Sequence, residues 1–122
     1  NTKFVAEFIG SPQMNLFNCK IENGIAHIAN IKIKLNNSKN INDASLGIRP
    51  DDILISDNGQ HSCEANLVEY LGSDMIIYSK IGNQDFSCKL SSKINLNAGD
   101  TFKFDISDSL VHLFDNTTGS RV

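Results

Sequence analysis

Apolar and polar residues alternate along most of the chain with a period of two, which is the pattern of strands that bury one face. The alternation is clearest over residues 14–22 and 31–35. Turn-forming residues interrupt it, and Asn23–Gly24 is a strong hairpin signal because both residues tolerate a positive φ. Residues 36–44 are polar, lack apolar periodicity and are predicted to form a loop. We therefore expect roughly eight to ten short strands, almost no helix and an all-β fold.

The first twelve residues follow a different pattern. Residues 4–9 place their apolar side chains at helical spacing, and Gly10 followed by Pro12 would end such a helix. We expect a short helical lead-in over residues 1–12, which serves as a linker, followed by a single domain over residues 13–122.

A chain of 122 residues with 40% hydrophobic and 20% charged residues fits one folded domain with its own core. Among small all-β folds, a five-stranded Greek-key barrel of the OB type suits this length. No apolar run approaches the ~18 residues of a membrane span, and we expect no signal peptide within these residues. Three widely spaced cysteines do not form a disulfide framework, so a reduced, cytoplasmic domain is expected.

The net charge of −3 argues against nucleic-acid binding, which depends on a basic surface. The aromatic residues include no tryptophan, and most phenylalanines fall at core-facing positions. Both facts weaken the base-stacking role that a stand-alone OB fold could have.

Motifs for chemistry are absent from these residues. There is no Walker A loop, no dinucleotide-binding G-x-G-x-x-G and no G-x-S-x-G nucleophile elbow, so neither nucleotide binding nor catalysis is expected. His61 and Cys63 would share one strand face, but H-x-C without a second cluster matches no structural zinc spacing, and we expect no metal. Asp51–Asp52 is interpreted as the first turn of a helix that begins at Pro50.

Four segments resemble motifs of the ATP-binding subunits of sugar-type ABC importers, in the family's order. They are F-V-A-E-F-I-G-S-P-Q-M-N at 4–15, L-G-I-R-P-D at 46–51, V-E-Y-L-G at 68–72, and H-L-F-D with the following T-G and R at 112–121. In that family these motifs belong to a C-terminal regulatory domain of OB type, often called TOBE. The resemblance covers nearly the whole chain, and its departures are small, such as Asp51 in place of the usual glutamate.

The resemblance implies that the chain is the regulatory and dimerisation part of a larger ATPase. The preceding nucleotide-binding domain would hold ATP and Mg²⁺, and this part would have no ATPase activity. The implied partners are a second copy, the membrane permease subunits and possible regulatory proteins, at the inner face of a bacterial cell membrane. The solute would be a sugar or sn-glycerol-3-phosphate, and the segment at 11–16 is most similar to glycerol-3-phosphate importers. An alternative is a small-ligand module, because related TOBE domains bind oxyanions.

The same motifs supply the candidate interdomain and interface residues. These are Gly10, Ser11, Pro12, Arg49, Pro50, Asp51 and His112. Gly10, Ser11 and Pro12 would form the turn into the first strand. The Arg49 guanidinium suits a carboxylate or carbonyl groups across an interface, although an ion pair within the domain is an equal alternative. His112 is predicted to face outward, while Leu113 and Phe114 are assigned to the core.

Overall fold

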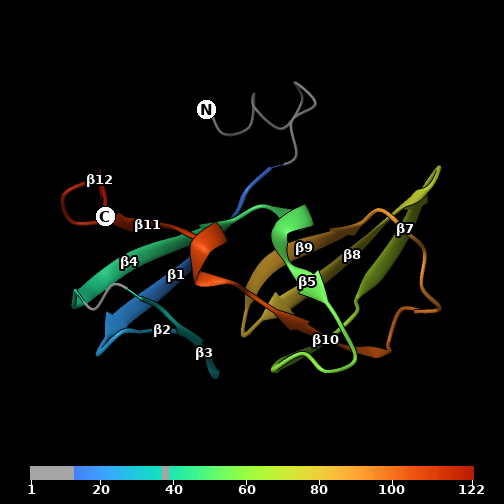
Figure 1. Cartoon of the computed structure of the whole chain (residues 1–122), viewed down its shortest axis with the longest axis horizontal. Coiled ribbons are helices and arrows are strands. Elements are labelled where there is room, and N and C mark those ends of the chain that lie inside the picture. The colour runs from blue at the N-terminus through green and yellow to red at the C-terminus, as the bar shows by residue number, and fades with distance from the viewer. Residues whose placement is uncertain (1–12, 37–38) are drawn as a thin grey trace.

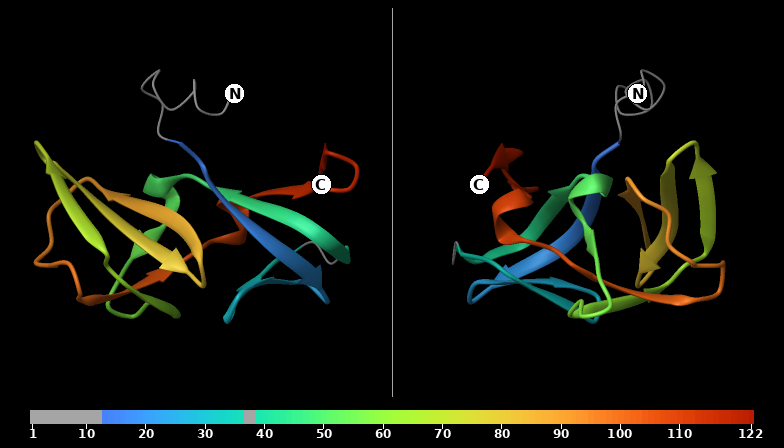
Figure 2. Two further views of the ribbon diagram at one scale, coloured as in Figure 1. Left: turned by 180° about the vertical axis from the view of Figure 1, so that it is seen from behind. Right: turned by 45° about the vertical axis from the view of Figure 1, so that its right-hand side comes forward.

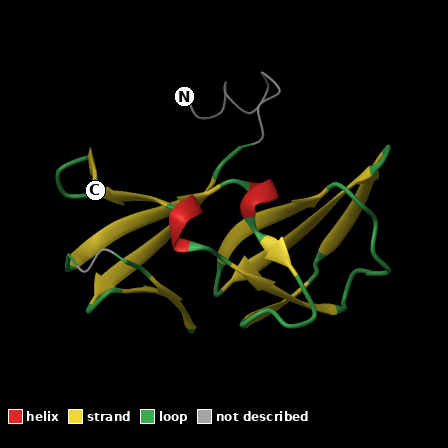
Figure 3. Cartoon of the chain, in the orientation of Figure 1, coloured by secondary structure: helices red, strands yellow, loops and turns green. Residues whose placement is uncertain are grey.

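Strands account for most of the computed structural model, which describes residues 13–36 and 39–122. These residues form twelve strands and two short 3₁₀ helices (Figure 1, Figure 3). The strands are β1 (Asn15–Glu22), β2 (Ile25–Ile28), β3 (Ile31–Lys34), β4 (Ile41–Ile48), β5 (Leu54–Ile55), β6 (His61–Glu64), β7 (Leu67–Leu71), β8 (Asp74–Ile81), β9 (Gln84–Leu90), β10 (Thr101–Asp105), β11 (His112–Asp115) and β12 (Ser120–Arg121). The 3₁₀ helices are η1 (Pro50–Asp52) and η2 (Asp108–Leu110).

The strands form three sheets in which the paired strands are antiparallel. The largest sheet has the order β12-β11-β4-β1-β2-β3, and the two smaller sheets are β5-β10-β6 and β7-β8-β9. The six-stranded sheet occupies one end of the molecule and β7-β8-β9 the other (Figure 1). Both views in Figure 2 place β7 at the outer margin, in agreement with its position at the edge of its sheet.

The hairpin between β1 and β2 forms where the sequence predicts it. Asn23 and Gly24 have φ angles of 55° and 76°, as a two-residue hairpin turn requires. The turn sets the register of the two strands, and Lys20 lies opposite His27. The β2–β3 hairpin continues the same sheet through Ala29, which also has a positive φ of 50°.

Three phenylalanine rings connect the three sheets through one hydrophobic core. Phe17 of β1, Phe86 of β9 and Phe104 of β10 are all buried. The ring centroids of Phe17 and Phe86 are 5.5 Å apart, and those of Phe86 and Phe104 are 5.7 Å apart. These distances are typical of favourable edge-to-face and tilted aromatic pairs. Each sheet therefore contributes one face to a shared interior.

Two side-chain amides join β1 to β9, although no backbone ladder connects these strands. The buried Asn15 donates from Nδ2 to the Ser87 carbonyl at 2.9 Å and accepts the Ser87 N–H at 2.9 Å. Gln84 accepts the Asn18 N–H at 2.7 Å and donates to the Asn18 carbonyl at 3.1 Å. We call these two interactions the amide clamps. Asn15 lies opposite Ser87 and Asn18 lies opposite Gln84, which is a single antiparallel register. Side-chain hydrogen bonds therefore hold β9 against β1.

The all-β prediction is confirmed, and the helical turn expected at Pro50 is η1. The helical lead-in expected over residues 1–12 lies outside the described residues. The loop predicted for residues 36–44 is wrong in its second half, because β4 begins at Ile41. The register of β1 and β4 shifts between Cys19 and Ile21, which marks a β-bulge. A bulge inserts an extra residue and breaks the two-residue period that sequence analysis relies on.

Candidate functional site

All three cysteine side chains are at least partly buried. Burial raises the pKa of Cys19 to about 11 and also raises the pKa values of Cys63 and Cys88, which keeps all three thiols protonated near neutral pH. Within residues 13–36 and 39–122, no group of three or more His, Cys, Asp or Glu side chains could hold a metal ion. No helix in the described part of the chain is long and apolar enough to cross a membrane.

Arg49 lies at the point where β4 ends and η1 begins. Its backbone is extended, with φ −73° and ψ 148°, and its carbonyl accepts the Asp52 N–H at 3.0 Å. The side chain is exposed, and among the described residues no carboxylate lies within 4.0 Å of it. The guanidinium is thus free to bind a group outside this part of the molecule.

Pro50 and Asp51 have different environments although they are adjacent. Pro50 is buried in η1, which packs against β9, whereas Asp51 is exposed. Pro50 therefore fixes the position of Arg49 and presents no surface of its own. Ile48, just before Arg49, pairs with Asn15, so this turn lies at the end of the molecule where β1 begins. Gly10, Ser11 and Pro12 lie outside the described residues.

His112 on β11 pairs with Gly47 on β4, and Gly47 lies two residues before Arg49. Nη2 of Arg121 donates a hydrogen bond to Nδ1 of His112 in the tautomer in which Nδ1 carries no proton. Gly47 also pairs with Leu16, which is 44% exposed, so the row Leu16–Gly47–His112 crosses the outer face of three strands. The structure thus brings His112 and Arg49 to one region of the six-stranded sheet.

The assignment of both Leu113 and Phe114 to the core is half correct. Leu113 is buried, at 9% exposure, but Phe114 is only partly buried and lies on the same face as His112. Successive residues of a strand point to opposite faces, so the two could not both enter the core.

The structure also presents an apolar surface that sequence analysis did not single out. Leu67 pairs with Tyr78 on the outer face of β7-β8-β9, and Leu71 lies on the same face. Their exposures are 51%, 36% and 53%, respectively. The Tyr78 hydroxyl donates to Glu69 at 2.8 Å, which raises the Tyr78 pKa and fixes its ring on this face. We call Leu67, Leu71 and Tyr78 the apolar face.

Comparison with known proteins gives matches to two family models. The description "MalK OB fold domain" matches residues 10–53, and "TOBE domain" matches residues 46–114. The two matched segments meet at the end of β4 and at η1.

Curated relatives align with nearly the whole chain. The oligosaccharides import ATP-binding protein MsmX of Bacillus subtilis is 34% identical over 98% of this chain and 37% of its own length. The sn-glycerol-3-phosphate import ATP-binding proteins UgpC of Ruegeria sp. and of Escherichia coli are each 32% identical, over 99% and 98% of this chain and 35% and 36% of their own lengths. The chain therefore spans little more than a third of the length of these relatives.

Proposed function

The chain belongs to the TOBE domain family, and from that premise we propose that it is the C-terminal regulatory and dimerisation domain of the ATP-binding subunit of a bacterial ABC importer. The observation that carries this proposal is the alignment of 98% of the chain with a third of an import ATP-binding protein. A shared fold alone would not support a function, but here the shared sequence extends over 98% of the chain.

We propose a simple division of the chain into a linker at residues 1–12 and one OB/TOBE domain at residues 13–122. The contacts among Phe17, Phe86 and Phe104 support a single domain, since they join the segments that the two family models match separately. The six-stranded sheet and its hairpins would supply the OB-type Greek-key barrel.

The chemistry of the importer would belong to a preceding nucleotide-binding domain, which would bind ATP and Mg²⁺. The regulatory domain would hold two ATPase subunits together while they open and close on their permease partners at the inner face of the membrane. Arg49 and Asp51, exposed at the end of the domain where β1 begins, would contact that preceding domain. The imported solute would be a sugar or sn-glycerol-3-phosphate, and identities of 34% and 32% support both classes.

A second copy of this chain would contact the apolar face. Leu67 and Leu71 lie on β7 and Tyr78 on β8, at the side of the molecule away from the six-stranded sheet (Figure 1), so two copies could meet there without obstructing Arg49. The Glu69 carboxylate lies between the two leucines and is hydrogen-bonded to Tyr78, so a second copy could cover the three apolar side chains while this carboxylate keeps its partner.

Sedimentation equilibrium at millimolar concentration tests this contact. We expect a weak dimer for the natural sequence, loss of the dimer in Leu67→Glu and Leu71→Glu, and no loss in Leu54→Glu. Leu54 is the matched control because it is 58% exposed but lies on β5, outside the apolar face. A monomer at every concentration would contradict the dimerisation role.

A further inference from the structure

Lysine and histidine side chains gather on the outer face of the hairpins β1-β2-β3. Lys20, His27 and Lys32 lie directly opposite one another across the three strands, and we call them the basic row. Lys34 follows in the next row of β3, opposite Ile25. All of these side chains point away from the core, since the alternate positions on each strand are buried.

Little within the domain neutralises this charge. The Lys20 and Glu22 groups are 3.9 Å apart and their side chains are 52% and 50% exposed, so this ion pair is weak. Among the described residues, neither Lys32 nor Lys34 has a carboxylate within 4.0 Å. The basic row therefore concentrates positive charge on one face of a chain whose net charge is −3.

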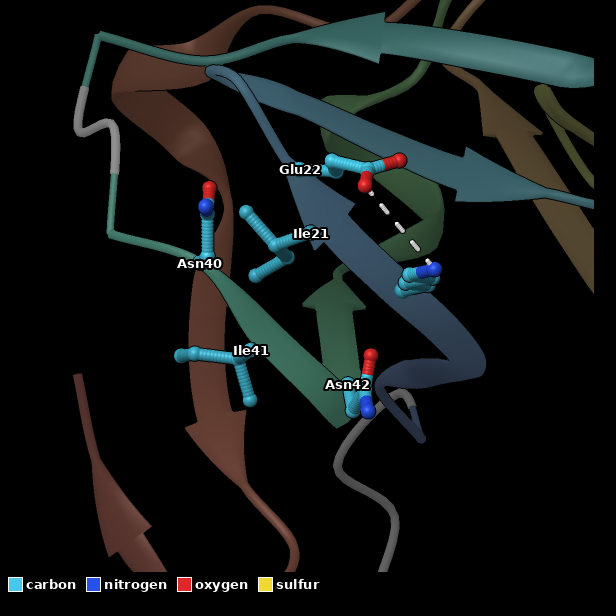
Figure 4. Close-up of a pocket in the computed structure, with 6 residues that line it drawn as sticks. Ile21, Glu22, Asn40, Ile41 and Asn42 are labelled. Atoms are coloured by element: carbon cyan, nitrogen blue, oxygen red, sulfur yellow. Dashed lines mark ion pairs between the residues drawn. The ribbon is translucent and has the colours of Figure 1, made fainter.

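A polar hollow adjoins the basic row at the β-bulge of β1 and β4. It has a volume of about 380 Å³ and is lined by Lys20, Ile21, Glu22, Asn40, Ile41 and Asn42. Figure 4 shows Asn42 on β4, Asn40 just before β4 and Glu22 on β1, with the dashed ion pair to Lys20. Asn40 accepts the Asn23 N–H through Oδ1 at 3.0 Å, which leaves its amide N–H groups free to donate. The hollow thus offers amide donors to a carboxylate, while its ammonium group, Lys20, is shared with the Glu22 carboxylate in the same lining.

From this arrangement we propose that the basic row and the adjoining hollow dock an acidic polypeptide segment of another protein. Neighbouring strands lie about 4.8 Å apart, so the row from Lys20 to Lys32 spans about 10 Å, the length of three extended residues. Several carboxylates of an extended acidic segment could therefore meet Lys20, Lys32 and Lys34 together. Such charge complementarity speeds association and selects the partner.

The surface favours a polypeptide over a nucleic acid. Neither the basic row nor the neighbouring row of Lys34 and Ile25 carries a Phe, Tyr or Trp ring on which a base could stack. The overall negative charge of the chain would also repel a long polyanion that extends beyond the row. The inference concerns a partner for this face and stands independently of the importer role.

Fluorescence anisotropy with a labelled oligoglutamate peptide at low ionic strength tests the docking surface. We expect saturable binding to the natural sequence and at least about tenfold weaker binding to the Lys32→Glu/Lys34→Glu double variant. The matched control is Lys80→Glu/Lys103→Glu, which changes the net charge equally at exposed positions outside the row. The control should bind within about twofold of the natural sequence.

Three results would overturn the proposal. The first is the absence of binding, and the second is an equal loss in both double variants, which would mean that net charge alone attracts the peptide. The third is tighter binding of a single-stranded oligonucleotide of matched charge, which would assign the face to nucleic acid. Circular dichroism of each variant checks that the fold is retained, and both pairs of lysines are exposed, so their replacement should leave the core unchanged.

Discussion

Gly59 lies at a position where a side chain has no room. A Cβ atom there would meet the backbone nitrogen of Phe104 and would lie 2.8 Å from its Cα and carbonyl carbon. Backbone atoms of a buried strand cannot move aside cheaply. At Gly47, by contrast, a Cβ atom would meet the sulfur of Met14 at 2.5 Å, at the end of a flexible side chain.

We therefore expect Gly59→Ala to lower the free energy of unfolding by about 2–3 kcal/mol, while Gly47→Ala should cost less than about 1.5 kcal/mol. Urea denaturation followed by circular dichroism measures both. Equal losses in the two variants would mean that the tight approach between the residue 59 turn and β10 does not contribute to stability.

The three thiols differ in exposure. Cys19 and Cys88 are buried, whereas Cys63 is half-buried on β6. We expect iodoacetamide at about pH 8 to modify Cys63 first and to reach Cys19 and Cys88 only after unfolding. Mass spectrometry of digested, partly modified protein gives the order. Early modification of Cys88 would contradict the closed core.

The raised thiol pKa of Cys19 also predicts how stability depends on pH. The ordinary value is 9.0 and the value in the folded protein is about 11, so the folded state retains a proton that the unfolded chain loses. The contribution to stability is therefore complete below pH 9 and is lost as the pH rises toward 11. The urea midpoint should fall over this interval, and a smaller fall in Cys19→Ala would attribute the effect to this thiol.

At the scale of elements, the amide clamps hold β9 against β1. Asn15 is 7% exposed and uses both ends of its amide on the Ser87 backbone. Removal of that amide would leave the part-buried carbonyl and N–H of Ser87 without their protein partners. Gln84 is more exposed, so water can replace its two hydrogen bonds to Asn18.

Asn15→Ala should therefore destabilise the domain by about 2–3 kcal/mol, and Gln84→Ala by less than about 1 kcal/mol. Asn18→Ala is the matched control, since Asn18 takes part in its clamp only through its backbone. Thermal unfolding of the three variants measures the order. A loss in Asn18→Ala as large as that in Asn15→Ala would show that the clamps do not determine the stability of this junction.

The same elements show what can be predicted from the sequence. The alternation in β1 and the Asn23–Gly24 turn predict strands and a hairpin because both signals are local. The clamp between Asn15 and Ser87 joins residues 72 positions apart, and no local pattern indicates it. The bulge that extends β4 to Ile41 likewise depends on the partner strand.

Part of the candidate site could also be predicted from the sequence. Arg49 and His112 were identified through family motifs, and the pairing of Gly47 with His112 brings them to one region. The apolar face was missed because Leu67 and Tyr78 meet only through the pairing of β7 with β8. The basic row could have been derived, since the two predicted hairpins place Lys20, His27 and Lys32 opposite one another.

At the scale of the whole molecule, one shared core supports three surfaces with different chemistry. Arg49 and Asp51 lie at the end where β1 begins, the apolar face lies on β7-β8-β9, and the basic row lies on β1-β2-β3. Our account gives these surfaces to the preceding domain, a second copy and an acidic partner, respectively. The separation of the surfaces would let one regulatory domain make all three contacts at once.

The central claim is that this chain is the regulatory end of an import ATPase, and the coding sequence upstream of Asn1 tests it most directly. The account predicts that the reading frame continues upstream through a Walker A loop, an ABC signature motif and a Walker B aspartate. A start codon immediately before Asn1 would contradict it and would make this chain a free-standing binding domain.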